Sequence, residues 1–267
     1  MKTQDAKIGI FDSGLGGLTV LKNLKKKYPS ESFIYIGDLA YLPYGNKSKH
    51  VIIERSKKIV EFFINQKVKS IIIACNSASS TALNILKKLY KIPINGVIYP
   101  SIQKAVKSTK TKSIGLIGTQ ATISSNAYVK ELYNYSQSQG PNLIQIHSVA
   151  CPLFVPIVEE GWEDTNIAHQ IATKYLINFN NCNIDTLILG CTHYPMLINT
   201  LKNVFKAFGY KKLNYIDSGD LIINLSPASA SQTTTDEFYI TDTCHTFNEL
   251  ANKFLGYKIP RIQSLSL

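Results

Sequence analysis

The stretch Leu187-Ile-Leu-Gly-Cys-Thr-His-Tyr-Pro195 has a close counterpart earlier in the chain, Ile71-Ile-Ile-Ala-Cys-Asn-Ser-Ala-Ser79. Each stretch is a short apolar run that ends in a small residue and a cysteine, followed by hydrogen-bonding side chains. Runs of this length and character are typical of strands that are buried on both faces of a parallel sheet. Because ligands of open α/β sheets bind at the carboxyl ends of the strands, we expect Cys75 and Cys191 to belong to one site.

The spacing of the two cysteines indicates a duplication. Cys191 stands 116 residues after Cys75, and a second pair of similar runs, Ile8-Gly-Ile-Phe and Ile114-Gly-Leu-Ile, is offset by 106 residues. The two offsets are close, so each half opens on a buried strand and carries one cysteine after a later strand. The sequence therefore predicts an α/β protein of two similar domains with mostly parallel sheets, and an active site in the cleft between them.

The expected crossing between the halves lies near Tyr99. We expect residues 1–98 and 213–267 to form the first α/β domain, which carries Asp12 and Cys75. Residues 99–212 are then the second α/β domain, which carries Glu159, Cys191 and His193. Within it, the polar segment 136–142, Ser-Gln-Ser-Gln-Gly-Pro-Asn, is predicted to be a loop.

Composition indicates a soluble globular protein. The chain has 267 residues, of which 45% are hydrophobic, enough for two α/β cores. No apolar run is long enough to cross a membrane, and the first residues lack the apolar stretch of a secretory signal, so we expect a cytoplasmic protein. Five cysteines without a C-x-x-C pair favour free thiols in a reducing compartment, and no metal-ligand spacing is present.

The net charge of +11 invites a nucleic-acid interpretation. However, only Arg55 and Arg261 are arginines among the 29 basic residues, and arginine is best suited to bidentate base or phosphate recognition. The lysines are scattered along predicted helix faces, which is typical of a solvated surface. The scarcity of arginine and the scattered lysines therefore disfavour nucleic-acid binding as the main function, while a positive field would help to attract a small acidic substrate.

A glycine-rich loop, Asp12-Ser-Gly-Leu-Gly-Gly-Leu-Thr, follows the first predicted strand and turns into a helix that runs to about Lys27. Such a loop brings N–H groups to an anion. It lacks the Gly-Lys-Ser/Thr of a phosphate loop, and Thr19 stands where a dinucleotide fingerprint has its third glycine, so a carboxylate is the expected anion. Asp12 has two interpretations here, a helix N-cap or a group that handles protons.

Other polar residues follow strands or lie in turns that could cover the site. Leu42-Pro-Tyr-Gly-Asn46 is a turn-rich segment, and Asn76 and Ser77 follow the first cysteine. Thr192 and His193 follow the second, so a Cys/His interaction is plausible there. Glu159 and Glu160 end an apolar segment, and for either one alone a solvated surface position is the stronger alternative.

Two thiols on opposite sides of a small molecule suit inversion of a carbon centre. One base must remove a proton on one face and one acid must deliver a proton on the other. A thiol whose pKa is lowered by a helix N-terminus or a charge can take either role. A nucleophilic Cys/His hydrolase needs only one cysteine, and a redox pair needs sulfurs that touch, so neither explains the duplication.

At these residues the chain resembles the glutamate racemases, cofactor-independent enzymes of the aspartate/glutamate racemase superfamily that supply D-glutamate for peptidoglycan. The resemblance runs from about Lys7 to about Gly219 and rests on five motifs: Phe11-Asp-Ser-Gly-Leu-Gly-Gly, Pro43-Tyr-Gly, Ala74-Cys-Asn-Ser-Ala-Ser, Phe154-Val-Pro-Ile-Val-Glu and Leu189-Gly-Cys-Thr-His-Tyr-Pro.

The resemblance implies two flavodoxin-like domains and racemisation of L-glutamate to D-glutamate with no cofactor and no metal. It implies that Cys75 and Cys191 are the two bases, with Asp12 supporting the first, His193 the second, and Glu159 rather than Glu160 assisting. The residues that match substrate-binding positions are Asp12, Ser13, Tyr44, Gly45, Asn76, Ser77, Thr192 and His193, with Thr119 and Thr122 as further candidates.

Two positions depart from the family pattern. Ser77 stands where threonine is common, which keeps the hydroxyl and loses a methyl, and Tyr99 stands where many members have glutamate. An aspartate racemase of the same superfamily is the alternative among enzymes, and a basic, non-enzymatic nucleic-acid-binding protein is the alternative from another class. We expect the protein to bind a small molecule, glutamate, and not to associate with a membrane. A homodimer is possible, and the sequence does not decide between monomer and homodimer.

Overall fold

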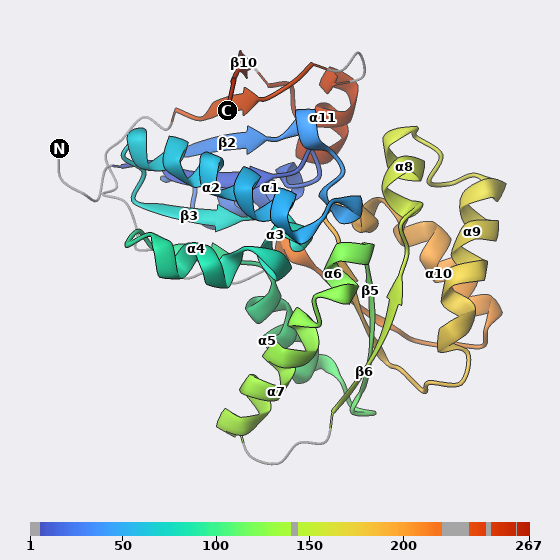
Figure 1. Ribbon diagram of the computed structural model, residues 1–267. Coiled ribbons are helices and arrows are strands. Elements are labelled where there is room, and N and C mark those ends of the chain that lie inside the picture. Colours follow the sequence, from blue (N-terminus) through green and yellow to red (C-terminus); the bar gives the residue numbers. More distant parts are fainter. Residues whose placement is uncertain (1–5, 140–143, 221–234, 244–246, 260) are drawn as a thin grey trace.

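The computed structural model describes residues 6–139, 144–220, 235–243, 247–259 and 261–267, and these residues form two sheets flanked by helices (Figure 1). All described strand pairs are parallel. The strands of the first sheet, in spatial order, are β10 (Gln263–Ser264), β9 (Glu237–Ile240), β2 (Phe33–Gly37), β1 (Ile8–Asp12), β3 (Ser70–Ile73) and β4 (Ile94–Gly96). Those of the second sheet are β6 (Gln145–Ala150), β5 (Ser113–Gly118), β7 (Thr186–Gly190) and β8 (Asn214–Asp217).

The two sheets repeat one strand order. The order β2-β1-β3-β4 in the first sheet corresponds to β6-β5-β7-β8 in the second. β1 and β5, which begin the two halves, lie inside their sheets, and β3 and β7, which precede the cysteines, lie beside them. The prediction of an α/β fold with two parallel sheets is therefore confirmed, and the repeat is visible in the topology.

Apolar side chains on both faces of the sheets explain why the strands form. Alternate residues of β2 face opposite sides. Ile34 and Ile36 join a cluster with Phe63 of helix α2 (Lys49–Asn65), whereas Phe33 and Tyr35 join a cluster with Leu21 of helix α1 (Leu18–Lys27). This second cluster continues into the second half of the chain, so a common core joins the two halves. The helices are α1 (Leu18–Lys27), α2 (Lys49–Asn65), α3 (Asn76–Thr81), α4 (Leu83–Leu89), α5 (Ile98–Ser108), α6 (Gln120–Ser124), α7 (Ala127–Gln139), α8 (Phe154–Glu159), α9 (Asn166–Leu176), α10 (Ile198–Ala207) and α11 (Phe247–Leu255).

One strand lies in the other sheet from the one expected. β8 falls in the segment 213–267, which the sequence assigns to the first domain, but it pairs with β7 in the second sheet. β8 is the fourth strand of the repeat, as β4 is in the first half. Its pairing with β7 satisfies main-chain groups of β7 that would otherwise lie at an edge of the sheet. The chain contributes to the first sheet again only at β9.

Two local differences concern the segment around residue 140. Helix α7 continues to Gln139, so residues 136–139 of the predicted loop are helical, and its remaining residues lie outside the described part of the chain. Glutamine is a good helix former, and the loop prediction rested on polar composition alone. The edge strand β6 has no counterpart among the predicted strands, because its residues are half-buried or exposed and form no continuous apolar run.

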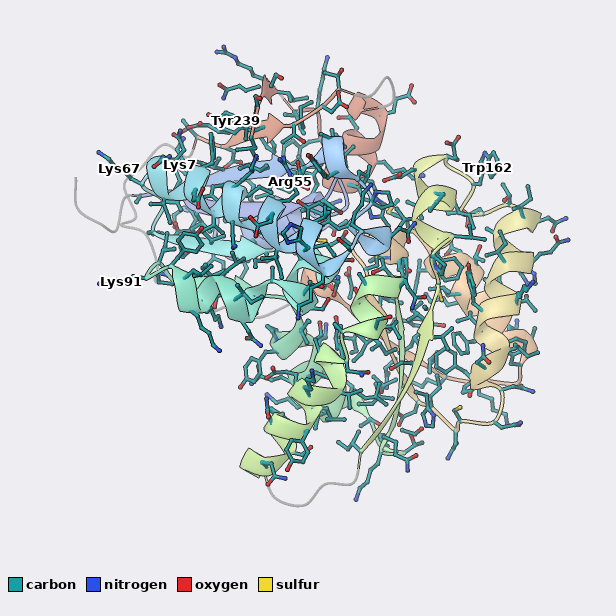
Figure 2. The ribbon with its side chains drawn as sticks, in the orientation of Figure 1. Lys7, Arg55, Lys67, Lys91, Trp162 and Tyr239 are labelled. Carbon is teal, nitrogen blue, oxygen red and sulfur yellow. The ribbon has the colours of Figure 1, made fainter. Side chains whose placement is uncertain are left out.

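The surface carries much of the positive charge. Lys67 and Lys91 are exposed and extend away from the body of the protein (Figure 2). None of the helices in the described ranges combines the length and apolar character that a membrane span requires.

Candidate active site

The two cysteines of the repeated stretches lie just beyond the ends of their strands. Cys75 caps the N-terminus of α3, two residues after β3, and Cys191 directly follows β7. Both are buried, with 4% and 6% of their surfaces exposed, and neither forms a disulfide. The Cys75 thiol donates a hydrogen bond to Ser13 Oγ over 3.7 Å. These two thiols are therefore enclosed, and each comes from one half of the repeat.

A chain of polar contacts joins the two halves around Cys191. Thr192 Oγ1 donates to Asp12 Oδ1 of the first half over 3.3 Å. His193 Nδ1 lies 4.0 Å from Cys191 Sγ, and its Nε2 lies 3.1 Å from Glu159 Oε1. Four of the five residues that were expected to carry the catalysis thus form one cluster, and the fifth, Cys75, is the N-cap residue of α3. Glu160, in contrast, is exposed.

The glycine-rich loop lets the halves approach each other closely. A Cβ on Gly16 would lie 2.3 Å from Thr192 Oγ1 and 2.7 Å from His193 Nδ1, distances that are too short for any side chain. Asp12 is not the N-cap of α1, since that position belongs to Gly17. Instead, Asp12 is fully buried and Oδ2 accepts the Gly14 N–H over 3.0 Å. Of the two interpretations of Asp12, the N-cap is wrong.

Burial and neighbouring charges shift the pKa values of Cys75, Asp12 and His193. Burial, together with the nearby Asp12, raises the pKa of Cys75 to about 12. Burial also raises the pKa of Asp12, although His193 and loop N–H groups oppose this. For His193, burial lowers the pKa, but hydrogen bonds with Cys191 and Glu159 outweigh it and raise the pKa to about 10. At neutral pH, Cys75 is therefore a thiol and His193 an imidazolium that faces Cys191.

The polar side chains that follow Cys75 form hydrogen bonds with the second half. Ser77 Oγ lies 2.8 Å from Thr119 Oγ1, which in turn lies 3.0 Å from Thr122 Oγ1. Asn76 is held from the second half as well. Its Oδ1 accepts from the Tyr128 hydroxyl over 2.7 Å, and its Nδ2 donates to Ser218 Oγ over 3.1 Å.

Tyr128 and Ser218 were not expected from the sequence. Ser218 lies in a second Asp-Ser-Gly motif at 217–219, which was a usable signal because it repeats the motif of the glycine-rich loop. Tyr128 lies inside α7, among other tyrosines, and carries no local signal. Both hold Asn76 in one orientation, so they act on the candidate binding groups indirectly.

The expected substrate-binding turn contacts both halves. Tyr44 and Gly45 begin the short helix η3 (Tyr44–Asn46) and are buried. The Tyr44 hydroxyl donates to Asp38 Oδ2 over 2.5 Å, so its side chain is engaged within the first half. A Cβ on Gly45 would lie 2.5 Å from the Cβ of Thr119, which explains why a glycine is needed at this contact with the second half.

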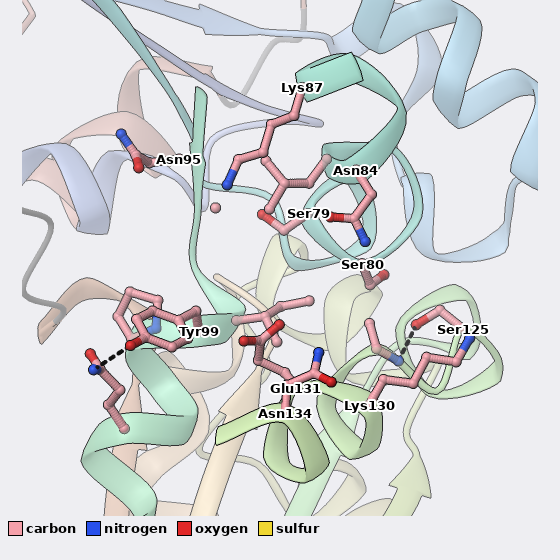
Figure 3. Close-up of a pocket in the computed structure, with 16 residues that line it drawn as sticks. Ser79, Ser80, Asn84, Lys87, Asn95, Tyr99, Ser125, Lys130, Glu131 and Asn134 are labelled. Atoms are coloured by element: carbon pink, nitrogen blue, oxygen red, sulfur yellow. Dashed lines mark hydrogen bonds between the residues drawn. The ribbon is translucent and has the colours of Figure 1, made fainter. Parts of the chain in front are cut away.

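A separate cavity lies between α4 and the helices α5 and α7 of the second half (Figure 3). It has a volume of about 690 Å³, and its walls include Lys87, Tyr99, Lys130 and Glu131 but neither thiol. Ser79 of α3 is part of this wall, and its hydroxyl donates to Ile73 O at the end of β3 over 2.9 Å. No cluster of three or more His, Cys, Asp or Glu side chains in the described ranges is arranged to hold a metal ion.

Sequence comparison agrees with this geometry. The chain matches the Asp/Glu/Hydantoin racemase family over residues 23–225. It is 44% identical to a glutamate racemase of Sulfurihydrogenibium sp. over 93% of this chain and 94% of that protein, and 44% identical to one of Hydrogenobaculum sp. over 98% and 99%.

Structural comparison gives the same result. The crystal structure of glutamate racemase from Francisella tularensis in complex with D-glutamate superposes with a TM-score of 0.87 at 33% identity, covering 98% of each chain. The chain therefore belongs to the Asp/Glu/Hydantoin racemase family and, within it, to the glutamate racemases, which are isomerases that racemise an amino acid.

Proposed function

We propose that this protein interconverts L- and D-glutamate by a two-thiol acid/base mechanism that needs no cofactor. The observation that carries the proposal is the pair of buried cysteines, Cys75 and Cys191, which come from equivalent places in two repeated halves. Each lies in a different polar setting, one beside Ser13 and one beside His193. Inversion of one carbon by proton transfer requires a base on one face and an acid on the other, and two thiols can supply both.

In the L-to-D direction, the Cys191 thiolate removes the α-proton of L-glutamate and becomes a thiol. The Cys75 thiol donates its proton to the opposite face of the α-carbon and becomes a thiolate. The product is D-glutamate, and one proton has moved from Cys75 to Cys191. In the D-to-L direction the two cysteines exchange roles, so that the reverse reaction restores the starting protonation state.

The electrostatics of the cluster suit these starting roles. His193 is held as an imidazolium between Cys191 and Glu159, and its Nδ1 lies 4.0 Å from Cys191 Sγ. Burial and Asp12 keep Cys75 protonated, ready to act as the acid. For the D-to-L direction Cys75 must lose its proton, and the ammonium group of the bound substrate lowers thiol pKa values by its positive charge.

The polar groups around Cys75 supply the contacts that hold the substrate. We assign this role to Ser13, Asn76, Ser77 and Thr192, with Thr119 and Thr122 behind them. For Tyr44 the contact comes from the main chain, because its hydroxyl donates to Asp38. Tyr44 and Gly45 are the first residues of a helical turn, whose leading N–H groups have no partner within the turn. In the cell, the D-glutamate would serve peptidoglycan synthesis in the cytoplasm.

Serine variants of the two cysteines test the mechanism. Cys75→Ser and Cys191→Ser should each abolish racemisation of glutamate, since a serine hydroxyl is too weak an acid and base. With a substrate that carries a leaving group on the β-carbon, elimination needs only proton removal. Cys75→Ser should then still process the L-form, and Cys191→Ser the D-form.

Cys182 provides the matched control, because it is a free, half-buried cysteine of the second half that lies outside the cluster. Cys182→Ser should keep full activity. The reverse enantiomer preference in the elimination assay would exchange the two roles, and racemisation by either serine variant would remove that cysteine from the mechanism. Faster turnover of aspartate than of glutamate by the unaltered protein would identify an aspartate racemase instead.

A further inference from the structure

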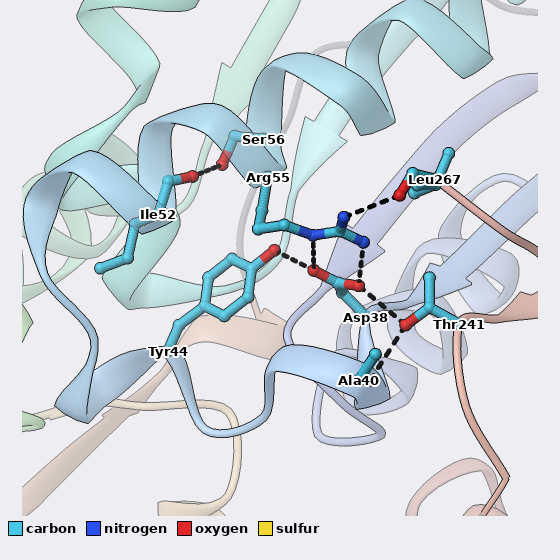
Figure 4. Close-up of polar contacts among 8 residues, drawn as sticks. All are labelled: Asp38, Ala40, Tyr44, Ile52, Arg55, Ser56, Thr241 and Leu267. Carbon is cyan, nitrogen blue, oxygen red and sulfur yellow. Dashed lines mark hydrogen bonds and ion pairs between the residues drawn. The ribbon is translucent and has the colours of Figure 1, made fainter.

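The carboxylate of Asp38 is the centre of a buried hydrogen-bond network behind the 43–46 turn (Figure 4). Arg55 donates to it twice, from Nε to Oδ2 over 2.9 Å and from Nη2 to Oδ1 over 2.8 Å. Thr241 donates to Oδ1 over 2.8 Å, and the Tyr44 hydroxyl donates to Oδ2 over 2.5 Å. Both carboxylate oxygens are thus saturated by three side chains from three separate segments of the chain.

The partners of this network come from distant parts of the sequence. Asp38 follows β2, Arg55 lies in the middle of α2, and Thr241 follows β9. Arg55 also donates from Nη1 to the main-chain oxygen of Leu267 over 3.1 Å, and its guanidinium lies 4.1 Å from the centre of the Tyr41 ring. The C-terminal segments of the chain therefore reach the Asp38 carboxylate directly and through Arg55.

The network is largely closed to solvent. Asp38 is fully buried and Arg55 is 5% exposed, so either charge without the other would be costly. The bidentate contact fixes the plane of the carboxylate, because the guanidinium fork matches its geometry. A carboxylate held in this way presents Oδ2 to Tyr44 in one orientation. Tyr44 itself is fully buried and belongs to the turn whose other face, at Gly45, meets Thr119 of the second half.

We propose that Arg55 and Thr241 are positioning residues for substrate binding: through Asp38 and the Tyr44 hydroxyl, they fix the 43–46 turn over the site. This inference rests on the proposed function, in which Tyr44 and Gly45 contact the substrate. None of the hydrogen bonds of Arg55 and Thr241 described above reaches Cys75, Cys191 or His193. Their effect should therefore appear in substrate binding and not in proton transfer.

Kinetic constants of three variants test this role. Tyr44→Phe removes only the hydroxyl that reaches Asp38, Arg55→Lys keeps the charge but loses the fork, and Thr241→Val removes one hydrogen bond. We expect KM for both enantiomers of glutamate to rise about tenfold in Tyr44→Phe and Arg55→Lys, the effect of losing a hydrogen bond to a charged group. Thr241→Val should raise it about threefold, and kcat should change by less than about threefold in all of them.

A double-mutant cycle separates a relay from two independent effects. If Arg55 acts through Asp38 and Tyr44, the double variant Tyr44→Phe/Arg55→Lys should raise KM little more than the stronger single variant. The control is Glu31→Gln. Glu31 is 2% exposed and pairs with Lys69 over 2.7 Å, but it precedes β2, whereas Asp38 follows the same strand. This variant should lower the thermal stability without raising KM.

Hydrogen exchange supplies a readout that needs no substrate. The amides of residues 44–47 should exchange at least about fivefold faster in Tyr44→Phe and Arg55→Lys than in the unaltered protein or in Glu31→Gln. Unchanged KM and unchanged exchange in these two variants would overturn the proposal, as would multiplicative effects in the cycle or an equal rise of KM in Glu31→Gln. An unaltered protein that fails to racemise glutamate would refute the proposed function instead, and the exchange result would still decide whether the network holds the turn.

Discussion

Replacing Glu159 by glutamine tests the charge pair that holds His193 as an imidazolium. His193 Nε2 lies 3.1 Å from Glu159 Oε1, and this carboxylate is one of two partners that raise the pKa of His193 to about 10. A hydrogen bond between charged groups contributes about 1.5–3 kcal/mol, and one pKa unit corresponds to about 1.4 kcal/mol. Because the Glu159 side chain is 26% exposed, the lower end applies. We expect Glu159→Gln to lower the pKa of His193 by about one unit.

The assay is an NMR titration of the imidazole nitrogens, with the His193 signals assigned by comparison with His193→Asn. Glu160→Gln is the matched control, because Glu160 is the next residue, carries the same charge and is exposed. The alkaline limb of the pH–kcat profile should move to lower pH in Glu159→Gln and stay in place in Glu160→Gln. A pKa of His193 that is the same in Glu159→Gln and in Glu160→Gln would refute the reasoning.

The same charge pair predicts how stability depends on pH. The pKa of His193 is raised from 6.5 to about 10 in the folded state, so its contribution to stability is complete below pH 6.5 and is lost as the pH rises towards 10. Glu159→Gln should therefore lower the free energy of unfolding by about 1 kcal/mol near pH 6.5, and by less above pH 10. Denaturant unfolding at the two pH values measures the difference, and an equal loss at both would contradict the assignment of the charge to His193.

Three further changes have defined outcomes. Gly16→Ala would place a methyl group 2.3 Å from Thr192 Oγ1, and overpacking of this kind costs about 1–3 kcal/mol. Because the two halves would be pushed apart at the site, we expect kcat/KM to fall about tenfold or more. Unaltered kinetics would show that the halves need not meet there. Tyr128→Phe removes the 2.7 Å hydrogen bond to Asn76. This variant should raise KM severalfold while its circular dichroism spectrum stays unchanged, and an unaltered KM would show that Asn76 needs no such support. Protein dialysed against a chelator should racemise glutamate at its full rate, and activity that returns only with added metal or pyridoxal phosphate would contradict a cofactor-independent mechanism.

Local pattern was sufficient for the parts of the fold that are buried on both faces. Strands such as β3 and β7 are continuous apolar runs, so they could be predicted together with the cysteines that follow them. The edge strand β6 could not, because it is only partly buried and has one neighbour in its sheet. The sheet to which β8 belongs was also beyond local pattern, because strand pairing depends on segments that are far apart along the chain.

The sequence by itself determined the repeated halves, the two cysteines at strand ends and, through its motifs, the residues expected around them. Only the tertiary structure decided which side chains meet. Thr192 reaches Asp12 across 180 positions of the chain, and Arg55 meets Asp38 and the Leu267 main chain in a single contact network. Periodicity constrains which face of a strand or helix is buried, but it carries no information on the partner across an interface. Such contacts are set by how the two sheets and their helices pack.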